Sequence, residues 1–297
     1  MSSITTDPPK RRRPSLAALL SLVTSGLGQL YNRQPRRAAV AFLGEFAMAL
    51  VLTFVPPPTF AALVALFALA IIWKLGVVID AFVQARRQKA IELAAYNRGF
   101  VYVAAVLSAM LLSFALSPFR QIESFSIENE SNFPTLHQHD RVIAYGIAPG
   151  DLARGDMVIL RLPRDPKIST VKRIVGLPGE RVRMRQGQVL INDMPLHRTM
   201  IEPGAAPSSI QGRTFVEITP EGKGYLVLDQ MPDSPFDTLQ AQRVPVEHYW
   251  VLGDNRDDSL DSRAMFQVGF VPARNIYRKV AYVYWSRDRS RIGMTVE

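Results

Sequence analysis

Three polar residues in separate parts of the chain could together form a hydrolytic site: Ser131, Lys172 and Ser259. A serine hydroxyl attacks a carbonyl carbon efficiently only when a neighbouring base removes its proton. Lysine becomes such a base once its pKa falls from the ordinary value of about 10.4, and burial among apolar side chains lowers it by penalising the charged form. The three residues therefore predict acyl transfer, with lysine in the role that histidine has in other serine hydrolases.

Lys172 lies in a segment that is expected to form a short strand. Its sequence, TVKRIVGLPGE at 170–180, is rich in β-branched residues and ends in glycine and proline, which is typical of a strand followed by a turn. Ile174, Val175 and a strand expected at 157–160 would form apolar walls around the amine. A lone lysine on a strand is usually a solvated charge, so Lys172 is a candidate base only together with the two serine segments.

Four short motifs give the chain a resemblance to the type I signal peptidase family. The motifs resemble the family's nucleophile box S-M-x-P-T-L, its R-G-D lead-in, its lysine box and its last box, and they occur in the same order. In this chain they are Ser131, Pro134, Thr135 and Leu136, then RGD at 154–156, KRIVGLPG at 172–179 and GDNRDDSLDSR at 253–263. The resemblance covers roughly residues 121–285.

The resemblance implies a membrane-bound serine endopeptidase that releases signal peptides from exported proteins. It makes Ser131 the nucleophile and Lys172 the general base, while Ser259 hydrogen-bonds the neutral amine and aims it at Ser131. Asp261 and Arg263 are expected to form a supporting ion pair. The acidic segment that holds them does not match a calcium-binding EF-hand loop. Counted from Asp254, its sixth position is Ser259, where the loop requires glycine, and its twelfth is Met265, where the loop requires glutamate.

The family prefers small apolar side chains one and three residues before the cleaved bond, which implies shallow apolar substrate pockets. The residues expected to line them are Ile127, Ile143, Tyr145 and Val171.

The nucleophile box departs from the family pattern at three positions. Asn129 stands where a serine commonly supplies the second oxyanion donor, beside the backbone N–H of Ser131. An asparagine N–H can do the same work. Glu130 replaces a usual glycine and Asn132 a usual methionine. These departures leave an alternative open, in which the chain is a catalytically silent or specialised homologue that binds exported chains as a membrane-anchored module.

The charge of the chain is concentrated in its first part. Residues 1–118 contain 12 basic and 4 acidic residues, net +8, whereas 119–297 contain 23 and 22, net +1. The basic residues form short clusters around apolar runs and do not alternate with aromatic residues, so a nucleic-acid partner is not expected. The chain has no cysteine, which excludes disulfides and zinc–cysteine sites.

Three apolar runs in this first part, at 38–55, 59–78 and 100–117, are long enough to cross a bilayer. We expect residues 1–37 to form a basic cytoplasmic arm with an interfacial or re-entrant helix at 16–31, and 38–118 to form an anchor of three transmembrane helices. Prolines at 56–58 predict a hairpin between the first two. Basic loops mark the cytoplasmic side, so 119–297 is expected on the extracytoplasmic side of a bacterial inner membrane.

The remaining residues, 119–297, are expected to form a mainly β catalytic domain with antiparallel sheets in a barrel-like body, since short alternating segments are separated by glycine, proline and aspartate. A peripheral insertion is expected at about 195–245. The expected strands are 141–145, 157–162, 170–175, 181–191, 224–228, 249–252 and 279–285.

Neither a cofactor nor a metal is expected. His137 and His139 flank Gln138, but no further ligands lie nearby in the sequence, so both are interpreted as polar turn residues. The expected partners are signal-peptide-bearing precursor proteins and the lipid bilayer, and the protein is expected to be a monomer.

Two charged residues lie well inside the first two apolar runs, Glu45 and Lys74. An isolated charge near the bilayer interior costs about 2.5 to 3.5 kcal/mol. Two explanations stay open at this point: an ion pair between the two residues across the hairpin, or a lysine that extends to the headgroups beside Trp73.

Overall fold

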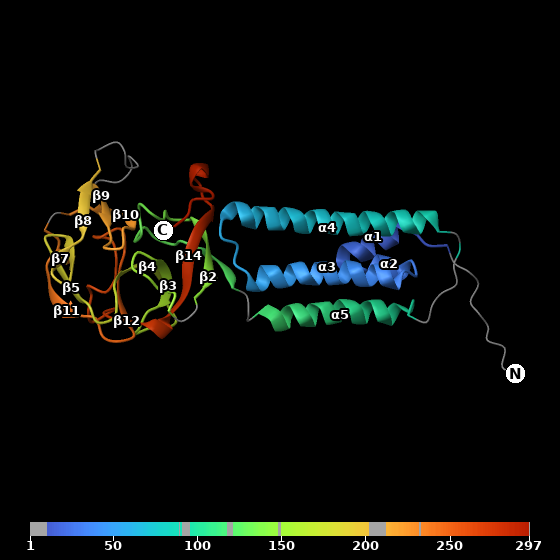
Figure 1. Ribbon diagram of the computed structural model, residues 1–297, viewed down its shortest axis with the longest axis horizontal. Helices are drawn as coiled ribbons and strands as arrows, with labels where there is room; N and C mark the ends of the chain where they lie inside the picture. The colour runs from blue at the N-terminus through green and yellow to red at the C-terminus, as the bar shows by residue number, and fades with distance from the viewer. Residues whose placement is uncertain are drawn as a thin grey trace. The chain divides into compact units, whose positions relative to one another are not determined.

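The protein is described here from a computed structural model, and the structure describes residues 11–88, 90, 96–117, 121–147, 150–201, 212–231 and 233–296. The chain divides into two compact units, Met1–Gln121 and Ile122–Glu297. The first is helical and the second is mainly β-sheet (Figure 1).

The described residues of the helical unit form the helices α1 (Pro14–Val23), α2 (Leu27–Tyr31), α3 (Pro35–Phe54), α4 (Phe60–Arg87) and α5 (Gly99–Leu116). Of these, α3, α4 and α5 are long and apolar enough to cross a membrane, and at most 11% of the apolar window of each is buried. Their apolar side chains therefore face outward, as expected of helices surrounded by lipid. The segment expected as one interfacial helix at 16–31 is instead two short helices.

Glu45 of α3 and Lys74 of α4 form an ion pair, with Lys74 Nζ 3.0 Å from Glu45 Oε1. The backbone N–H of Ser25, in the turn between α1 and α2, donates to Glu45 Oε2 at 2.9 Å. Lys74 also donates to Ser25 Oγ at 3.3 Å. Of the two explanations that the sequence left open, the structure shows the pair.

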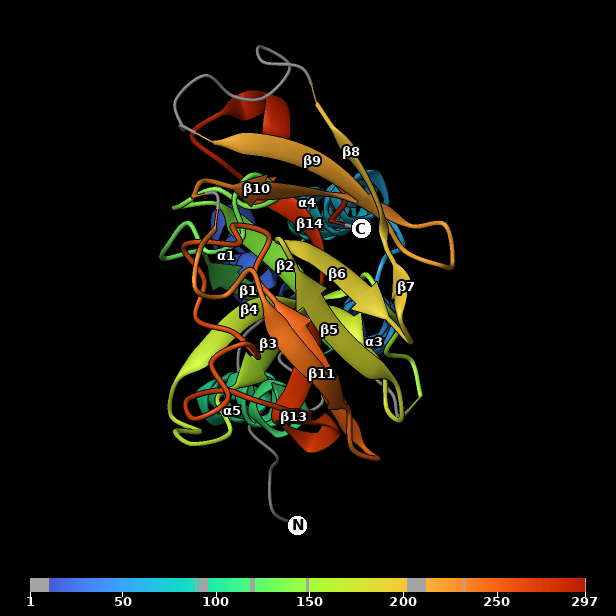
Figure 2. The same cartoon turned by 90° about the vertical axis from the view of Figure 1, so that its left-hand side faces the viewer.

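In the second unit, the residues that the structure describes form three antiparallel sheets (Figure 2). The strand order is β1-β2-β14-β3-β4-β12-β13 in the largest, β10-β9-β8 in the second and β11-β5-β6-β7 in the third. The strands are β1 (Ile122–Ser126), β2 (Arg141–Gly146), β3 (Met157–Arg161), β4 (Ser169–Gly176), β5 (Arg181–Arg185), β6 (Gln188–Ile191), β7 (Met194–Pro195), β8 (His197–Met200), β9 (Arg213–Ile218), β10 (Gly224–Asp229), β11 (Leu239–Arg243), β12 (His248–Leu252), β13 (Val271–Pro272) and β14 (Ile276–Trp285).

The expectation of apolar helices followed by a mainly antiparallel β unit is confirmed, but the expectation of a barrel-like body is wrong. The largest sheet is open, since its end strands β1 and β13 are not paired with each other. The strand β13 has only two residues, and one of them, Pro272, has no N–H to donate to a further strand. The single strand expected at 181–191 is also wrong: it is a hairpin of β5 and β6, turning at Gln186 and Gly187, which both have positive φ.

The segment expected as a peripheral insertion, about 195–245, supplies β8, β9 and β10 and the strand β11, which pairs with β5. It is only partly peripheral, because Glu217 of β9 is completely buried. The lysine strand β4 lies inside the largest sheet, between β3 and β12.

Candidate active site

Ser131 and Lys172 lie side by side in the β-rich unit. Ser131 is in the turn that follows β1, and its carbonyl oxygen accepts a hydrogen bond from the N–H of Asn255 at 3.2 Å. Lys172 is in the middle of β4, and its Nζ lies 3.0 Å from Ser131 Oγ. The two side chains come from segments 41 residues apart, so the sheet brings a hydroxyl and an amine within proton-transfer distance.

Lys172 is almost completely buried, with 2% of its surface exposed. Val158 lies directly opposite it on β3, and Ile174 follows on the same face of β4. Burial lowers the pKa of Lys172 to about 8, although the Asp261 carboxylate opposes this effect. A substantial fraction of the amine is therefore neutral near physiological pH, which a general base requires.

Asn132, the residue after Ser131, connects Ser131 to β4. Its Nδ2 donates to the carbonyl oxygen of Val171 at 2.8 Å and lies 3.4 Å from Ser131 Oγ. An amide nitrogen has two hydrogens, so both contacts can form together. The Asn132 side chain is 2% exposed, and its Oδ1 is buried without a hydrogen-bond partner among the described residues.

Next to Lys172, one edge of β4 pairs with no strand among the described residues, and the Asn132 side chain bonds the Val171 carbonyl there. On one side β4 pairs with β3 over residues 169–173, but on the other side its pairing with β12 begins only at Arg173. Ile174 exchanges backbone hydrogen bonds with residues 155 and 156, on the β3 side. Because backbone directions alternate along a strand, Val171 faces the open edge. An extended peptide could pair with β4 there.

The last motif, 253–263, packs against the nucleophile through a glycine. A Cβ atom at Gly253 would overlap Ser259 Oγ and the carbonyl oxygen of Ser131, so only glycine allows this approach. Asp261 and Arg263 form the expected ion pair, with Arg263 Nη2 2.8 Å from Asp261 Oδ2. Both side chains are 1% exposed. Burial raises the pKa of Asp261, but Arg263 outweighs this effect and holds the pKa below its ordinary value.

Two expected hydrogen bonds differ in the structure. Ser259 Oγ is buried but has no hydrogen-bond partner among the described residues, so it does not contact the lysine amine as expected. Asn129 was expected to donate into an oxyanion site, yet its Oδ1 accepts the N–H of Ser131 at 3.2 Å. A free backbone N–H attracts the carbonyl end of a nearby amide, so the two expected oxyanion donors are bonded to each other.

The four expected pocket residues do not share one surface. Ile127 belongs to a buried apolar cluster with Leu136, Val142 and Ala144, and Val171 packs against that cluster. Ile143 and Tyr145 alternate with Val142 and Ala144 along β2 and therefore face the other way. The Tyr145 hydroxyl donates to the Tyr282 hydroxyl at 2.9 Å. The strand expected at 141–145 is present as β2, and Ile143 and Tyr145 lie on its face away from Ile127 and Val171.

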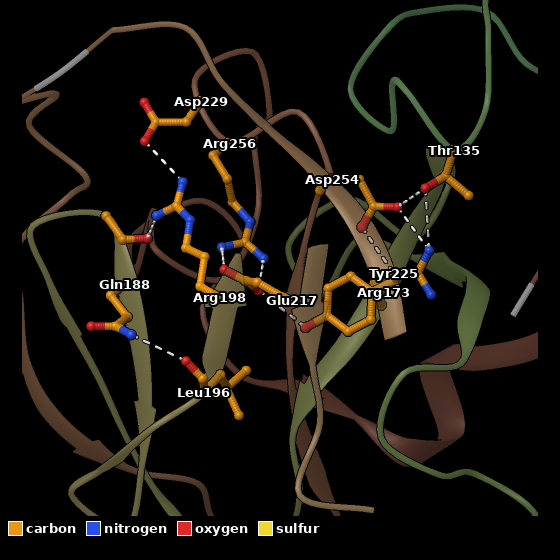
Figure 3. Close-up of polar contacts among 12 residues, drawn as sticks. Thr135, Arg173, Gln188, Leu196, Arg198, Glu217, Tyr225, Asp229, Asp254 and Arg256 are labelled. Carbon is orange, nitrogen blue, oxygen red and sulfur yellow. Dashed lines mark hydrogen bonds and ion pairs between the residues drawn. The ribbon is translucent and has the colours of Figure 1, made fainter. Parts of the chain in front are cut away.

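Sequence analysis missed a chain of buried polar contacts next to the dyad (Figure 3). Arg173, the residue after the lysine, donates to both carboxylate oxygens of Asp254 at 2.8 Å. The Thr135 hydroxyl of the nucleophile box donates to the same carboxylate at 2.5 Å. The Arg173 guanidinium lies 4.4 Å from the centre of the Tyr225 ring. The motifs containing Thr135, Arg173 and Asp254 provided the only signal for this cluster.

A second buried pair in this region joins Arg256 of the last motif to Glu217 of β9. The Tyr225 hydroxyl donates to Glu217 at 3.3 Å, so the two clusters are connected (Figure 3). The arginine of the RGD motif is also buried: Arg154 binds the carboxylate of Glu180 through two nitrogens, at 2.9 and 2.6 Å. Among the described residues, no three histidine, aspartate or glutamate side chains converge in a geometry that could hold a metal ion.

Comparisons with known proteins agree on one family. The profile described as "Signal peptidase, peptidase S26" matches residues 99–285. A signal peptidase I from Rickettsia prowazekii (strain Madrid E) is 32% identical over 139 residues, 45% of this chain and 52% of the relative. A signal peptidase I from Rickettsia bellii (strain OSU 85-389) is 32% identical over 196 residues, which are 56% of this chain and 66% of the relative. The matches thus span about half to two thirds of these relatives.

Among solved structures, a crystal structure of a signal peptidase I from Enterococcus faecalis V583 is 28% identical. The alignment covers 43% of this chain and 96% of that chain, with a TM-score of 0.28.

Proposed function

The chain belongs to the signal peptidase family, peptidase S26, and on that premise we propose that it is a membrane-bound serine endopeptidase that cleaves signal peptides from exported proteins. Ser131 is the nucleophile and Lys172 the general base. The observation that carries the proposal is the 3.0 Å contact between Ser131 Oγ and the buried Lys172 Nζ. A solvated surface lysine would have neither this burial nor this partner.

The reaction proceeds in two steps. Neutral Lys172 takes the proton of Ser131 Oγ while this oxygen bonds to the carbonyl carbon of the cleaved peptide. The tetrahedral oxyanion then collapses, the C–N bond breaks, and the protonated amine gives its proton to the leaving nitrogen. In the second step Lys172 takes a proton from water, whose oxygen attacks the ester carbon. The bond between this carbon and Ser131 Oγ then breaks, and Lys172 returns the proton to Ser131 Oγ.

The oxyanion requires donors in place before its charge develops. Ser131 N–H is one candidate. Asn129 is the second, and rotating its amide by 180° would exchange the accepting oxygen for the donating nitrogen. We propose that a substrate carbonyl displaces Asn129 Oδ1 from Ser131 N–H and that the rotated amide then donates beside it.

The substrate is an extended peptide that pairs with the open edge of β4 at Val171. The apolar cluster beside that edge would form the pocket walls, with Ile127, Val142 and Ala144 in place of Ile143 and Tyr145. These walls are close-packed, which favours small apolar side chains near the cleaved bond.

The helical unit anchors the enzyme in the membrane. Basic residues lie where α3 begins, where α4 ends and just before α5 begins: Arg36, Arg37, Arg86, Arg87 and Arg98. This distribution supports a cytoplasmic position for those ends. Three crossings then put the catalytic unit on the periplasmic side of a bacterial inner membrane.

Incubation of the purified full chain with a signal-peptide-bearing precursor tests this function. We expect cleavage after the signal peptide, with mass spectrometry locating one bond, and loss of cleavage in Ser131→Ala. A wild-type protein that binds the precursor without cutting it would instead favour the silent binding module.

A further inference from the structure

A basic cavity of about 530 Å³ lies in the helical unit, at the end where α1 and α5 begin. No carboxylate is among the described residues that line it, whereas three guanidinium groups and two phenols are. The lining residues are Arg11, Arg12, Arg13, Leu16, Tyr31, Asn97, Gly99 and Tyr102. This cavity is remote in sequence from the Ser131–Lys172 dyad and has no role in the reaction described above.

Two donors of Arg12 have no partner in the part of the chain that the structure describes. Its Nε and Nη2 atoms are buried without a hydrogen-bond partner among the described residues. The guanidinium lies over the Tyr31 ring, 4.3 Å from its centre, which holds the charged group in place. Buried donors without acceptors are costly, so an acceptor is expected beside Arg12 Nε and Nη2, and a ligand bound in this cavity would supply it.

The two phenols of the cavity can also act as donors. The N–H of Arg13 donates to the Tyr31 hydroxyl at 3.2 Å, and Asn97 Nδ2 donates to the Tyr102 hydroxyl at 2.8 Å. Each oxygen therefore accepts a bond, and its own hydrogen is available for donation. The cavity thus offers positive charge and donors together, which suits a ligand with several negatively charged acceptor oxygens.

We propose that this cavity binds the phosphate of an anionic phospholipid headgroup. A phosphate has the charge and the acceptor oxygens that match paired guanidinium donors. The cavity lies at the helix ends that carry Arg86, Arg87 and Arg98, where headgroups of a bilayer lie, and basic cavities between membrane helices are suited to such headgroups. Since none of the residues of α5 is buried, a bound headgroup would also fasten the start of α5 to α1 and α2.

Native mass spectrometry of the full chain released from nanodiscs tests the proposal. We expect wild type to retain phosphatidylglycerol in preference to phosphatidylcholine. Arg12→Gln should weaken this retention by about tenfold or more, because a hydrogen bond to a charged group is lost. Arg86→Gln is the matched control: it removes the same charge from an exposed residue at the same membrane end, and it should retain phosphatidylglycerol like wild type. Tyr102→Phe, which removes one donor only, should weaken retention less than Arg12→Gln.

Three results would overturn the proposal. They are equal retention of both lipids by wild type, equal losses in Arg12→Gln and Arg86→Gln, and unchanged retention in Arg12→Gln together with Tyr102→Phe. A further experiment with inorganic phosphate tests whether the bound phosphate belongs to a lipid headgroup or is a soluble ion. If millimolar phosphate alone stabilises wild type against heat as much as phosphatidylglycerol does, the ligand is a soluble phosphate and the lipid assignment is wrong.

Discussion

Arg256 and Glu217 form a two-pronged buried ion pair, with Arg256 Nη1 2.9 Å from Oε1 and Nη2 2.6 Å from Oε2. Glu217 belongs to β9 of the inserted segment, and Arg256 belongs to the motif that also holds Ser259. The carbonyl oxygen of Arg256 accepts a hydrogen bond from Arg263. The inserted segment therefore holds the loop that packs against the nucleophile.

Glu217→Gln should destabilise the catalytic unit and lower kcat. It leaves the buried Arg256 without its counter-charge, and breaking a buried pair typically costs about 3 to 5 kcal/mol. Thermal unfolding measures the loss. Glu221→Gln in the same segment is the control, because the Glu221 side chain is 49% exposed beside Arg154, and exposed pairs contribute about 1 kcal/mol or less. Equal effects of the two variants would contradict a special role for Glu217.

The pH dependence of kcat/KM should report Lys172. Burial lowers its pKa to about 8, and only the neutral amine accepts a proton, so activity should rise with pH through about 8 and then level off. Lys172→Arg should be inactive, because guanidinium stays protonated. Full activity well below pH 7, or residual turnover in Lys172→Arg, would assign the base elsewhere.

Stability should depend on pH in the same window. The unfolded chain holds the Lys172 proton up to about 10.4, whereas the folded chain loses it near 8. Between these values the unfolded state binds more protons, so the free energy of unfolding of wild type, relative to Lys172→Met, should rise with pH. If chemical denaturation gives the same difference in free energy of unfolding between wild type and Lys172→Met at every pH from 8 to 10, the lowered pKa is contradicted.

Asn132→Leu should reduce kcat by about three- to tenfold. The substitution keeps the size of the side chain but removes the donors to Ser131 Oγ and to the Val171 carbonyl, and one such hydrogen bond contributes about 0.5 to 1.5 kcal/mol. The midpoint of the pH profile should stay at its wild-type value, since Lys172 keeps its burial. A normal kcat with lowered KM would show instead that the asparagine only competes with substrate for the edge of β4.

Asn129→Ala should lower kcat by about a hundredfold or more if the rotated amide donates to the oxyanion. Asn129→Asp separates two roles of this side chain: donation to the oxyanion, and acceptance of the hydrogen bond from Ser131 N–H. A carboxylate still accepts the N–H of Ser131 but offers no N–H of its own, so this variant should be at least as impaired as the alanine. Near-normal single-turnover rates in Asn129→Ala would leave the backbone N–H as the oxyanion donor.

The Glu45–Lys74 pair predicts that substitutions of the two residues have non-additive effects on the stability of the helical unit. Glu45→Gln and Lys74→Met should each lower the melting temperature in detergent or bilayer, since each leaves one charge without its partner. The double variant should recover much of the loss. Strictly additive changes would mean that the two charges are solvated independently.

Sequence motifs predicted the chemistry of the site better than its surroundings. Ser131 and Lys172 could be named because each sits in a local pattern of its own. Glu217 could not, because its partner lies 39 residues away and no motif surrounds it. Long-range pairs of this kind depend on how sheets pack, which local patterns do not specify.

Two further features could not be read from local patterns with certainty: the face of one strand and the boundary of another. The strand at 141–145 was predicted correctly, but the choice between Val142 and Ile143 as inward residues depends on which face of β2 meets the apolar cluster. A shift of one residue exchanges all the side chains. The hairpin at Gln186 and Gly187 did have a local signal, since glycine favours a turn with positive φ.

The contact between Glu45 and Lys74 also constrains how the helices are inserted during synthesis. The two residues are 29 positions apart on consecutive helices, so Glu45 emerges from the ribosome well before Lys74 does. Released alone into hydrocarbon, α3 would expose an unpaired carboxylate at a cost of about 2.5 to 3.5 kcal/mol. This cost would be avoided if the insertion machinery held α3 in a polar, protein-lined space until α4 is made. If both helices cross the bilayer, we expect them to enter the lipid together, with Glu45 and Lys74 already paired.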